Sequence, residues 1–158
     1  MTTEQAIPNE RRLVMRLLNY WRGLTDGETF PSESKIDSTA IADMWPHCAV
    51  LDVAAKEADP KIAYVGIALI DAVGMDISGK RLSQVPADTL VAKGFSYFGE
   101  VLVKKVPITY GGEFVARRGV KMRYRSIILP LAENGVNINR LLAAELRRDD
   151  PVTVRKKA

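Results

Sequence analysis

Three β-rich runs fill the last third of the chain, and they restrict its architecture more than any other feature. The runs are Pro107–Ala116, Val120–Ala132 and Val136–Leu146, and turn residues separate each from the next. Arg117-Arg118-Gly119 joins the first two. Asn134-Gly135 favours a tight hairpin, because a type I′ turn needs positive φ at two successive positions. The runs therefore predict a meander of antiparallel strands.

The middle run also predicts which side of its strand faces water. Basic and uncharged side chains alternate along it: Lys121, Arg123 and Arg125 against Met122, Tyr124 and Ser126. Because neighbouring side chains of a strand point to opposite faces, this alternation indicates one wet and one buried face. In the preceding run, Gly111-Gly112 predicts a bulge or a tighter turn.

Two earlier segments have the apolar spacing of helices. The first begins after Pro8-Asn9, and its apolar stripe consists of Leu13, Leu17, Leu18 and Trp21. The second, Thr89–Lys105, follows a capping Asp88 and ends before Pro107. Its stripe consists of Val91, Phe95, Phe98 and Leu102, at intervals of four, three and four residues. Each stripe must be buried against another surface.

Shorter elements connect these segments. In order, they are a short helix at Thr39–Met44 ended by Pro46, strands at Cys48–Val53 and Lys61–Gly66, helical turns at Ile67–Val73 stopped by Gly74, and a turn at Asp76–Lys80. The whole order is helix, short helix, two strands, short helices, one long helix and three antiparallel strands.

That order resembles a PAS domain preceded by an extra N-terminal helix. The motifs that carry the resemblance are Tyr20-Trp21-Arg22, Pro31-Ser32, Ile36-Asp37, Pro46-His47, Leu51-Asp52-Val53, Tyr64-x-Gly66, Asp76-x-Ser78-Gly79 and Leu129-Pro130-Leu131. Together they are similar to small stand-alone bacterial PAS proteins. The resemblance implies an α+β fold: a five-stranded antiparallel sheet with its first strand central, covered by helices on one face that enclose a small pocket.

The expected organisation is an N-terminal helix and loop over residues 1–35, a PAS-like sensor domain over 36–146 and a basic tail over 147–158. The pocket-lining residues that we expect are Tyr64, Phe95, Phe98, Met122, Tyr124 and His47. The alternative is that these side chains simply fill the core. Tyr20 and Trp21 on the first helix are candidates for contact with a partner, and the alternative for Trp21 is packing inside its own domain.

The residues offer little for cofactor chemistry. His47, the only histidine, lies outside the predicted long helix, where haem-binding PAS domains usually carry their histidine. Cys48, the only cysteine, lacks the Asn-Cys-Arg context of light-sensing flavin members. These observations argue against haem and flavin, and no metal site is expected, while a small organic ligand is compatible with the fold. One cysteine also excludes a disulfide framework and a thiolate zinc site.

Length and charge restrict the class of protein further. The chain has 158 residues, enough for one domain with its own core. Its longest charge-free run, Ile62–Ile70, is far shorter than the roughly 20 apolar residues of a membrane span. The start lacks a secretory signal, so we expect a cytoplasmic protein. Three of the four net positive charges fall in residues 147–158, which argues against a nucleic-acid-binding body.

The sequence therefore predicts a non-enzymatic sensory module that acts through contact with an unidentified signalling protein and with a second copy of itself, as a homodimer. Two alternatives stay open. One is a cone-shaped α+β enzyme that uses His47 with Asp52 or Asp37. The other is a nucleic-acid binder that uses the basic tail and the arginine-bearing first helix.

Overall fold

The computed structural model describes residues 9–54, 59–115 and 119–147. The helices are α1 (Asn9–Leu24), α2 (Ile67–Val73), α3 (Leu90–Gly94) and α4 (Phe98–Lys104). Three short 3-10 helices are η2 (Glu33–Lys35), η3 (Trp45–His47) and η4 (Leu82–Gln84). The strands are β1 (Cys48–Asp52), β2 (Lys61–Val65), β3 (Ile108–Val115), β4 (Lys121–Leu131) and β5 (Arg140–Arg147).

All five strands form one sheet in the order β2-β1-β5-β4-β3, and the four pairings are antiparallel. This confirms the predicted α+β class with its five-stranded antiparallel sheet. The central place belongs to β5, with β1 beside it, so the expectation that the first strand is central was wrong. The last strand of the described residues, β5, lies between the β1–β2 and β3–β4 hairpins and joins them.

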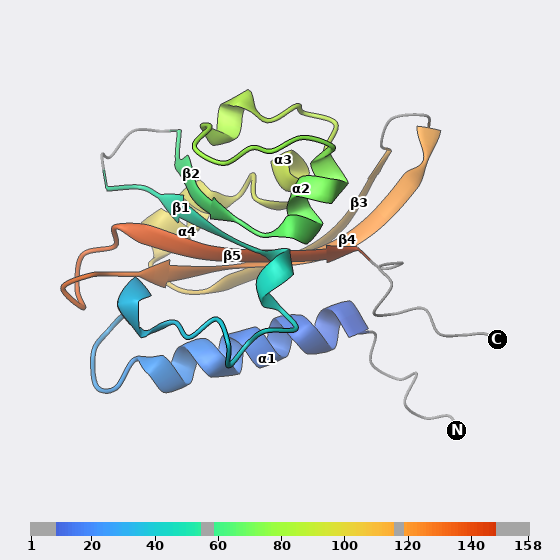
Figure 1. Cartoon of the computed structure of the whole chain (residues 1–158). Helices are drawn as coiled ribbons and strands as arrows, with labels where there is room; N and C mark the ends of the chain where they lie inside the picture. The colour runs from blue at the N-terminus through green and yellow to red at the C-terminus, as the bar shows by residue number, and fades with distance from the viewer. Residues whose placement is uncertain (1–8, 55–58, 116–118, 148–158) are drawn as a thin grey trace, which may run out of the picture.

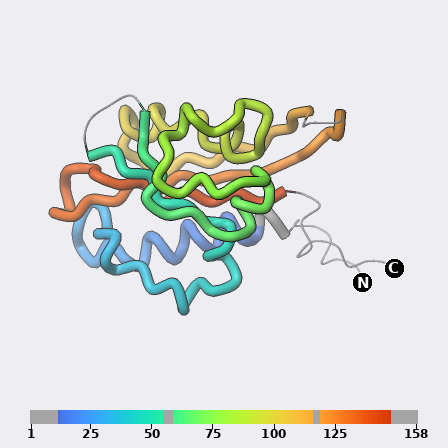
Figure 2. Tube along the Cα trace, turned by 45° about the horizontal axis from the view of Figure 1, so that its top comes forward, coloured from blue at the N-terminus to red at the C-terminus, as the bar shows by residue number. Residues whose placement is uncertain are grey.

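Helices cover both faces of the sheet (Figure 1). The three helices α2, α3 and α4 lie on one face, and α1 lies on the other (Figures 1 and 2). Each face therefore has its own apolar core. Alternate residues of β5 serve the two cores, with Leu141 and Ala143 on the α2–α4 side and Leu142 and Ala144 on the α1 side.

The stripe predicted for the first helix is the surface by which α1 packs on the sheet. Leu17 and Trp21 are buried against the sheet, in the same core as Leu129 and Leu142. The indole Nε1 of Trp21 donates a hydrogen bond of 2.8 Å to the carbonyl oxygen of Pro130. That buried bond ties α1 to β4, since a buried indole N–H needs an acceptor.

Several short elements form where local chemistry predicts them. The strands β1 and β2 and the helix α2 agree with the predicted segments to within one residue. Gly74 ends α2 in a left-handed conformation with φ of 90°, which glycine adopts without steric cost. In the following turn, the carboxylate of Asp76 accepts the backbone N–H of Ser78 at 2.9 Å.

The predicted long helix, in contrast, is two short helices. After Gly94 the chain leaves helical geometry for three residues, and α4 starts at Phe98. The hydroxyl of Ser126 in β4 donates to the carbonyl oxygen of Gly94 at 2.9 Å, and the amide of Phe98 turns instead to the carbonyl of Phe95. The sheet thus takes the acceptor that a continuous helix would use.

Three further local predictions were wrong. Residues 38–44 form successive tight turns in place of a helix, with the amide of Ala40 donating to the carbonyl of Asp37. The register of β3 with β4 is unbroken through Gly111 and Gly112, so there is no bulge. Between β4 and β5 the connection spans residues 132–139, because the carboxamide of Asn134 accepts two backbone amides and stabilises a wider loop.

None of the helices in the described ranges is long and apolar enough to cross a membrane. The loop residues Arg117 and Arg118, and residues 148–158 of the predicted basic tail, lie outside those ranges.

Candidate functional site

The space between the sheet and helices α2–α4 contains an apolar core with a polar cluster at one end. Phe95 is fully buried there, in the same core as Val101 and Ile128. The polar cluster consists of Glu145 of β5, Tyr124 and Ser126 of β4, and Tyr97, which lies between α3 and α4. Glu145 and Ser126 face each other across the β4–β5 ladder, so their side chains share a face of the sheet.

Glu145 is the most unusual member, because a carboxylate is seldom buried this completely. Its exposed fraction is 1%. Its carboxylate lies directly against the backbone of Gly94, where a Cβ atom would overlap it. Glycine at position 94 is therefore what allows α3 to approach β5 this closely.

Hydroxyl groups join the helix break to the sheet. Ser126 donates to the carbonyl of Gly94, and its oxygen lies 3.0 Å from the hydroxyl of Tyr97. The Tyr97 hydroxyl is also 3.3 Å from the carbonyl oxygen of Ile108. Two hydroxyl hydrogens thus serve three oxygen contacts, and Tyr97 has two acceptors for one proton.

Burial and charge keep both tyrosines of the cluster protonated. Burial raises the pKa of Tyr97 well above its usual value, and the negative charge of Glu145 raises it further, against the opposing effect of the Ser126 hydrogen bond. Burial and then Glu145 also raise the pKa of Tyr124. Both phenols therefore act as neutral hydrogen-bonding groups beside the carboxylate.

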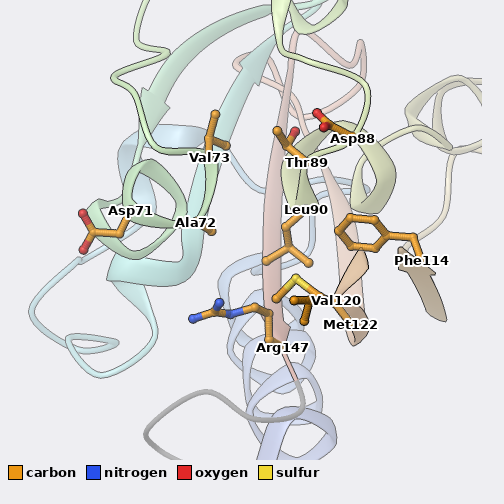
Figure 3. A pocket seen from close by; sticks show the side chains of 10 residues that line it. All are labelled: Asp71, Ala72, Val73, Asp88, Thr89, Leu90, Phe114, Val120, Met122 and Arg147. Atoms are coloured by element: carbon orange, nitrogen blue, oxygen red, sulfur yellow. The ribbon is translucent and has the colours of Figure 1, made fainter. Parts of the chain in front are cut away.

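A cavity of about 480 Å³ opens beside this core (Figure 3). It lies between α2, the start of α3, the β3–β4 hairpin and the end of β5. Its apolar lining includes Leu90, Phe114 and Met122, and its polar lining includes Asp71, Asp88, Thr89 and Arg147. This volume falls within the roughly 300–1,000 Å³ of typical ligand sites, which also combine an apolar lining with a few polar groups.

The predicted pocket residues divide between different places. Met122 lines the cavity, and Phe98 borders a second hollow of about 420 Å³ with Leu82 and Val85. Tyr124 lies over Gly112 and forms an edge-to-face contact with Phe114, at 6.1 Å between ring centroids. Phe95 belongs to the filled core.

Tyr64 and His47 lie away from these residues. Tyr64 packs in the core on the α1 side of the sheet, where its ring stacks on Trp45 at 4.5 Å. His47 ends η3, just before β1. Since Asp52 ends β1, the backbones of His47 and Asp52 are about 16 Å apart at the usual rise per residue of a strand. His47 and Asp52 are therefore too far apart to act as the catalytic pair of the enzyme alternative. The carboxylate of Asp37, the other suggested partner, accepts the amide of Thr39 and stabilises a turn.

The two candidates for partner contact are both engaged within the chain. Trp21 is 7% exposed and bonded to Pro130, so its role is core packing, which corrects the partner hypothesis for this residue. The hydroxyl of Tyr20 accepts the amide of Asp37 at 2.8 Å and holds the following segment against α1. Cys48 is fully buried on the α1 side, and burial raises the pKa of its thiol to about 12.

Sequence reasoning missed the roles of Gly94, Tyr97 and Glu145. For Glu145 a signal exists, because it is the one charged residue in the otherwise apolar stretch 141–146. A charge in a strand with no solvent-facing side is expensive and marks a position with a specific task. In the described part of the chain, no group of three or more histidine, cysteine, aspartate or glutamate side chains could hold a metal ion.

Comparison with solved structures supports the fold. One match, with a TM-score of 0.50 and 16% identity, is a light-oxygen-voltage domain studied with a flavin analogue; the match covers 72% of this chain and 84% of that one. The light-oxygen-voltage domain of a blue-light-activated histidine kinase from Erythrobacter litoralis gives 0.46 at 10% identity, over 63% and 93% of the two chains. A PAS domain of an HTR-like protein from Haloarcula marismortui gives 0.40 at 19% identity, over 70% and 90%.

These matches correct the expectation about cofactors. The sequence argued against flavin from the surroundings of Cys48, yet the fold matches a domain studied with a flavin analogue. The expectation against flavin was therefore wrong.

A search of curated proteins gave no match. The family model described as the PAS domain, in contrast, matches residues 10–149, which is most of the chain. This match agrees with the five-stranded antiparallel sheet and its helical cover. The chain therefore belongs to the PAS domain family, whose members are generally sensory and regulatory modules without catalytic activity.

Proposed function

We propose that this protein is a cytoplasmic, non-catalytic sensor in which a small organic ligand changes the packing of α3 and α4 on the sheet. The changed packing alters how the protein contacts a signalling partner. The observation that carries the proposal is the direct attachment of the end of α3 to strands β5 and β4. Gly94 touches Glu145 of β5, and its carbonyl is held by Ser126 of β4.

The cavity lies close to this attachment. Leu90 belongs both to its lining and to α3, and Met122 belongs to its lining and to the same strand face as Tyr124 and Ser126. A ligand seated there contacts the start of α3 and the strand beneath it at once. Its binding therefore favours one arrangement of α3 on the sheet over another, which is the requirement for a ligand to shift a conformational equilibrium.

The lining suits a ring compound with polar substituents, and flavin is one such compound. Leu90, Phe114 and Met122 would contact the ring, and the guanidinium of Arg147 would contact an anionic or carbonyl group. A bound flavin supplies absorption of visible light and electron transfer. Asp71 and Asp88 at the same rim favour a ligand that also carries hydrogen-bond donors.

The test is native mass spectrometry and visible absorption of protein purified without refolding, followed by thermal shift with flavin and a metabolite panel. We expect either an added mass or a raised melting temperature with at least one compound. Ala72→Phe on α2 should fill the cavity and abolish the effect. Ala68→Phe, at a half-buried position of the same helix outside the cavity lining, is the matched control.

Absence of any ligand effect, or an effect that Ala72→Phe and Ala68→Phe change equally, would contradict ligand control. Circular dichroism of both variants shows whether they fold. If Ala72→Phe folds and binds the ligand normally, the ligand binds at another site.

A further inference from the structure

The two edges of the sheet differ in how they are covered. Along β2, the amide of Ile62 donates to the carbonyl of Lys80, and its own carbonyl accepts the amide of Gly79, both at 2.8 Å. Lys61 and Arg81 form an isolated bridge beside this contact. The segment that follows α2 therefore closes the β2 edge. In contrast, β3 pairs with β4 on one side, and no strand of the described residues pairs with its other side.

The β3 edge has little of the usual protection against pairing. Natural edge strands carry proline, charged side chains or bulges, or are kept very short, and β3 has one charged residue, Glu113. In β3, eight residues pair with β4 without a register shift, and none of them is proline or lysine. Tyr110 and Val115 are 42% and 61% exposed. The joined ends of β3 and β4 also extend beyond the helical cover (Figures 1 and 2).

We propose that β3 pairs antiparallel with β3 of a second copy of this chain, with Gly111 of each copy at the twofold axis. The two five-stranded sheets then become one continuous sheet. A twofold axis perpendicular to the sheet keeps each side chain on its own face, so residues directly opposite must both be odd-numbered or both even-numbered.

With Gly111 at the axis, the strand is complementary to itself. Thr109 lies opposite Glu113 of the partner subunit, so a hydroxyl faces a carboxylate. Ile108 lies opposite Phe114 of the partner subunit, an aliphatic–aromatic pair of the kind that stabilises strand pairs. Tyr110 lies opposite Gly112 of the partner subunit, which has no side chain that could clash with it. The two Glu113 side chains are kept apart.

A charge contact favours the same arrangement. The guanidinium of Arg125 lies over Gly111, about 3.5 Å from where a Cβ atom would be. Its buried Nε has no hydrogen-bond partner among the described residues. Odd-numbered β3 side chains share this face, so Glu113 of the partner subunit would lie diagonally across from Gly111, over which the Arg125 guanidinium lies. In its own chain Glu113 lies 3.6 Å from Arg123 and 3.8 Å from Lys121, so the dimer adds a third cation to its surroundings. A second copy therefore brings a carboxylate to a cation that the edge presents.

Cysteine cross-linking of the full chain tests the register. Under mild oxidation, Gly111→Cys should give a covalent dimer, because the two cysteines meet at the axis at a separation that suits a disulfide. Glu113→Cys is the control on the same strand face, since it lies opposite Thr109 of the partner subunit and should cross-link much more slowly. The native Cys48 is fully buried and should not contribute.

Sedimentation over a range of concentrations tests the complementarity. Thr109→Glu places like charges opposite each other twice per dimer and should raise the dimer dissociation constant about tenfold. Combining it with Glu113→Thr exchanges the two groups and should restore dimerisation. Thr39→Glu, at an exposed position in the turns before η3, should change nothing.

A monomer at all concentrations would overturn the proposal. So would a dimer that Thr109→Glu leaves unchanged and Gly111→Cys fails to cross-link, because that dimer uses another surface. The outcome does not depend on whether the cavity binds a ligand, so this proposal and the proposed function fail separately.

Discussion

Replacing Ser126 by alanine removes a hydroxyl that joins α3 to strand β4. In the native protein this hydroxyl donates to the carbonyl of Gly94 at 2.9 Å and contacts the hydroxyl of Tyr97 at 3.0 Å. The side chain is fully buried, so water cannot replace it without opening the core. Tyr97 keeps its contact with the carbonyl of Ile108, whereas the Gly94 carbonyl loses its donor from the sheet.

The cost follows from that loss. A buried group deprived of its hydrogen-bond partner costs about 1–3 kcal/mol, so we expect Ser126→Ala to lower the free energy of unfolding by about 2 kcal/mol. For a domain of this size, each kcal/mol lowers the melting temperature by roughly 2–4 °C, which gives a fall of about 6 °C.

Urea denaturation followed by circular dichroism measures this change. Ser96→Ala is the matched control, since its hydroxyl donates to the carbonyl of Lys93 at 3.0 Å on the exposed side of the same region. It should change stability by less than about 0.5 kcal/mol. If Ser126→Ala proves as mild as Ser96→Ala, the attachment of α3 to the sheet does not depend on this hydroxyl, and our account of the helix break is refuted.

Three further substitutions test other contacts. Gly94→Ala should destabilise by about 1–3 kcal/mol, because its Cβ overlaps the Glu145 carboxylate, whereas Gly99→Ala, with open space around it, should be neutral or stabilising by up to about 1 kcal/mol in thermal unfolding. Trp21→Phe removes the 2.8 Å bond to Pro130 and should cost about 1–2 kcal/mol in the same assay. Burial raises the pKa of Tyr97 above its ordinary value of 10.0, so the stability that the neutral phenol contributes is complete below pH 10.0 and falls as the pH rises further. Tyr97→Phe should therefore reduce the loss of stability at alkaline pH, measured by chemical denaturation. An unchanged dependence of the free energy of unfolding on pH would contradict this role of Tyr97.

Sequence patterns predicted the elements whose causes are local. The helix α2 ends where Gly74 supplies a positive φ, and β4 alternates as its charges indicate from Lys121 to Tyr124, whereas Arg125 is half-buried. The break between α3 and α4 was not predictable from spacing, because its acceptor is taken by Ser126, which lies 32 residues later in the chain. The apolar stripe on Thr89–Lys105 is compatible with either one helix or two.

The candidate site was predicted only in part, because it also depends on contacts between distant parts of the chain. Alternation shows that a strand has two faces, but it does not show which helix covers each face. Tyr64 and Phe95 were therefore grouped together, although they lie on opposite sides of the sheet. Glu145 stands out in its apolar stretch, but its neighbours Gly94 and Tyr97 come from a different part of the chain and are known only from the fold.

The central strand has no side exposed to solvent, and this has a consequence for how the protein transmits a change. Its odd-numbered residues, including Glu145, border the helices of the cavity side, and its even-numbered residues, including Leu146, border α1. One stretch of backbone is therefore the common boundary of two densely packed interiors, and such interiors transmit strain. A ligand-induced shift of Glu145 would therefore also move the part of β5 on which α1 packs, and no hinge or loop movement would be needed to couple the two faces of the sheet.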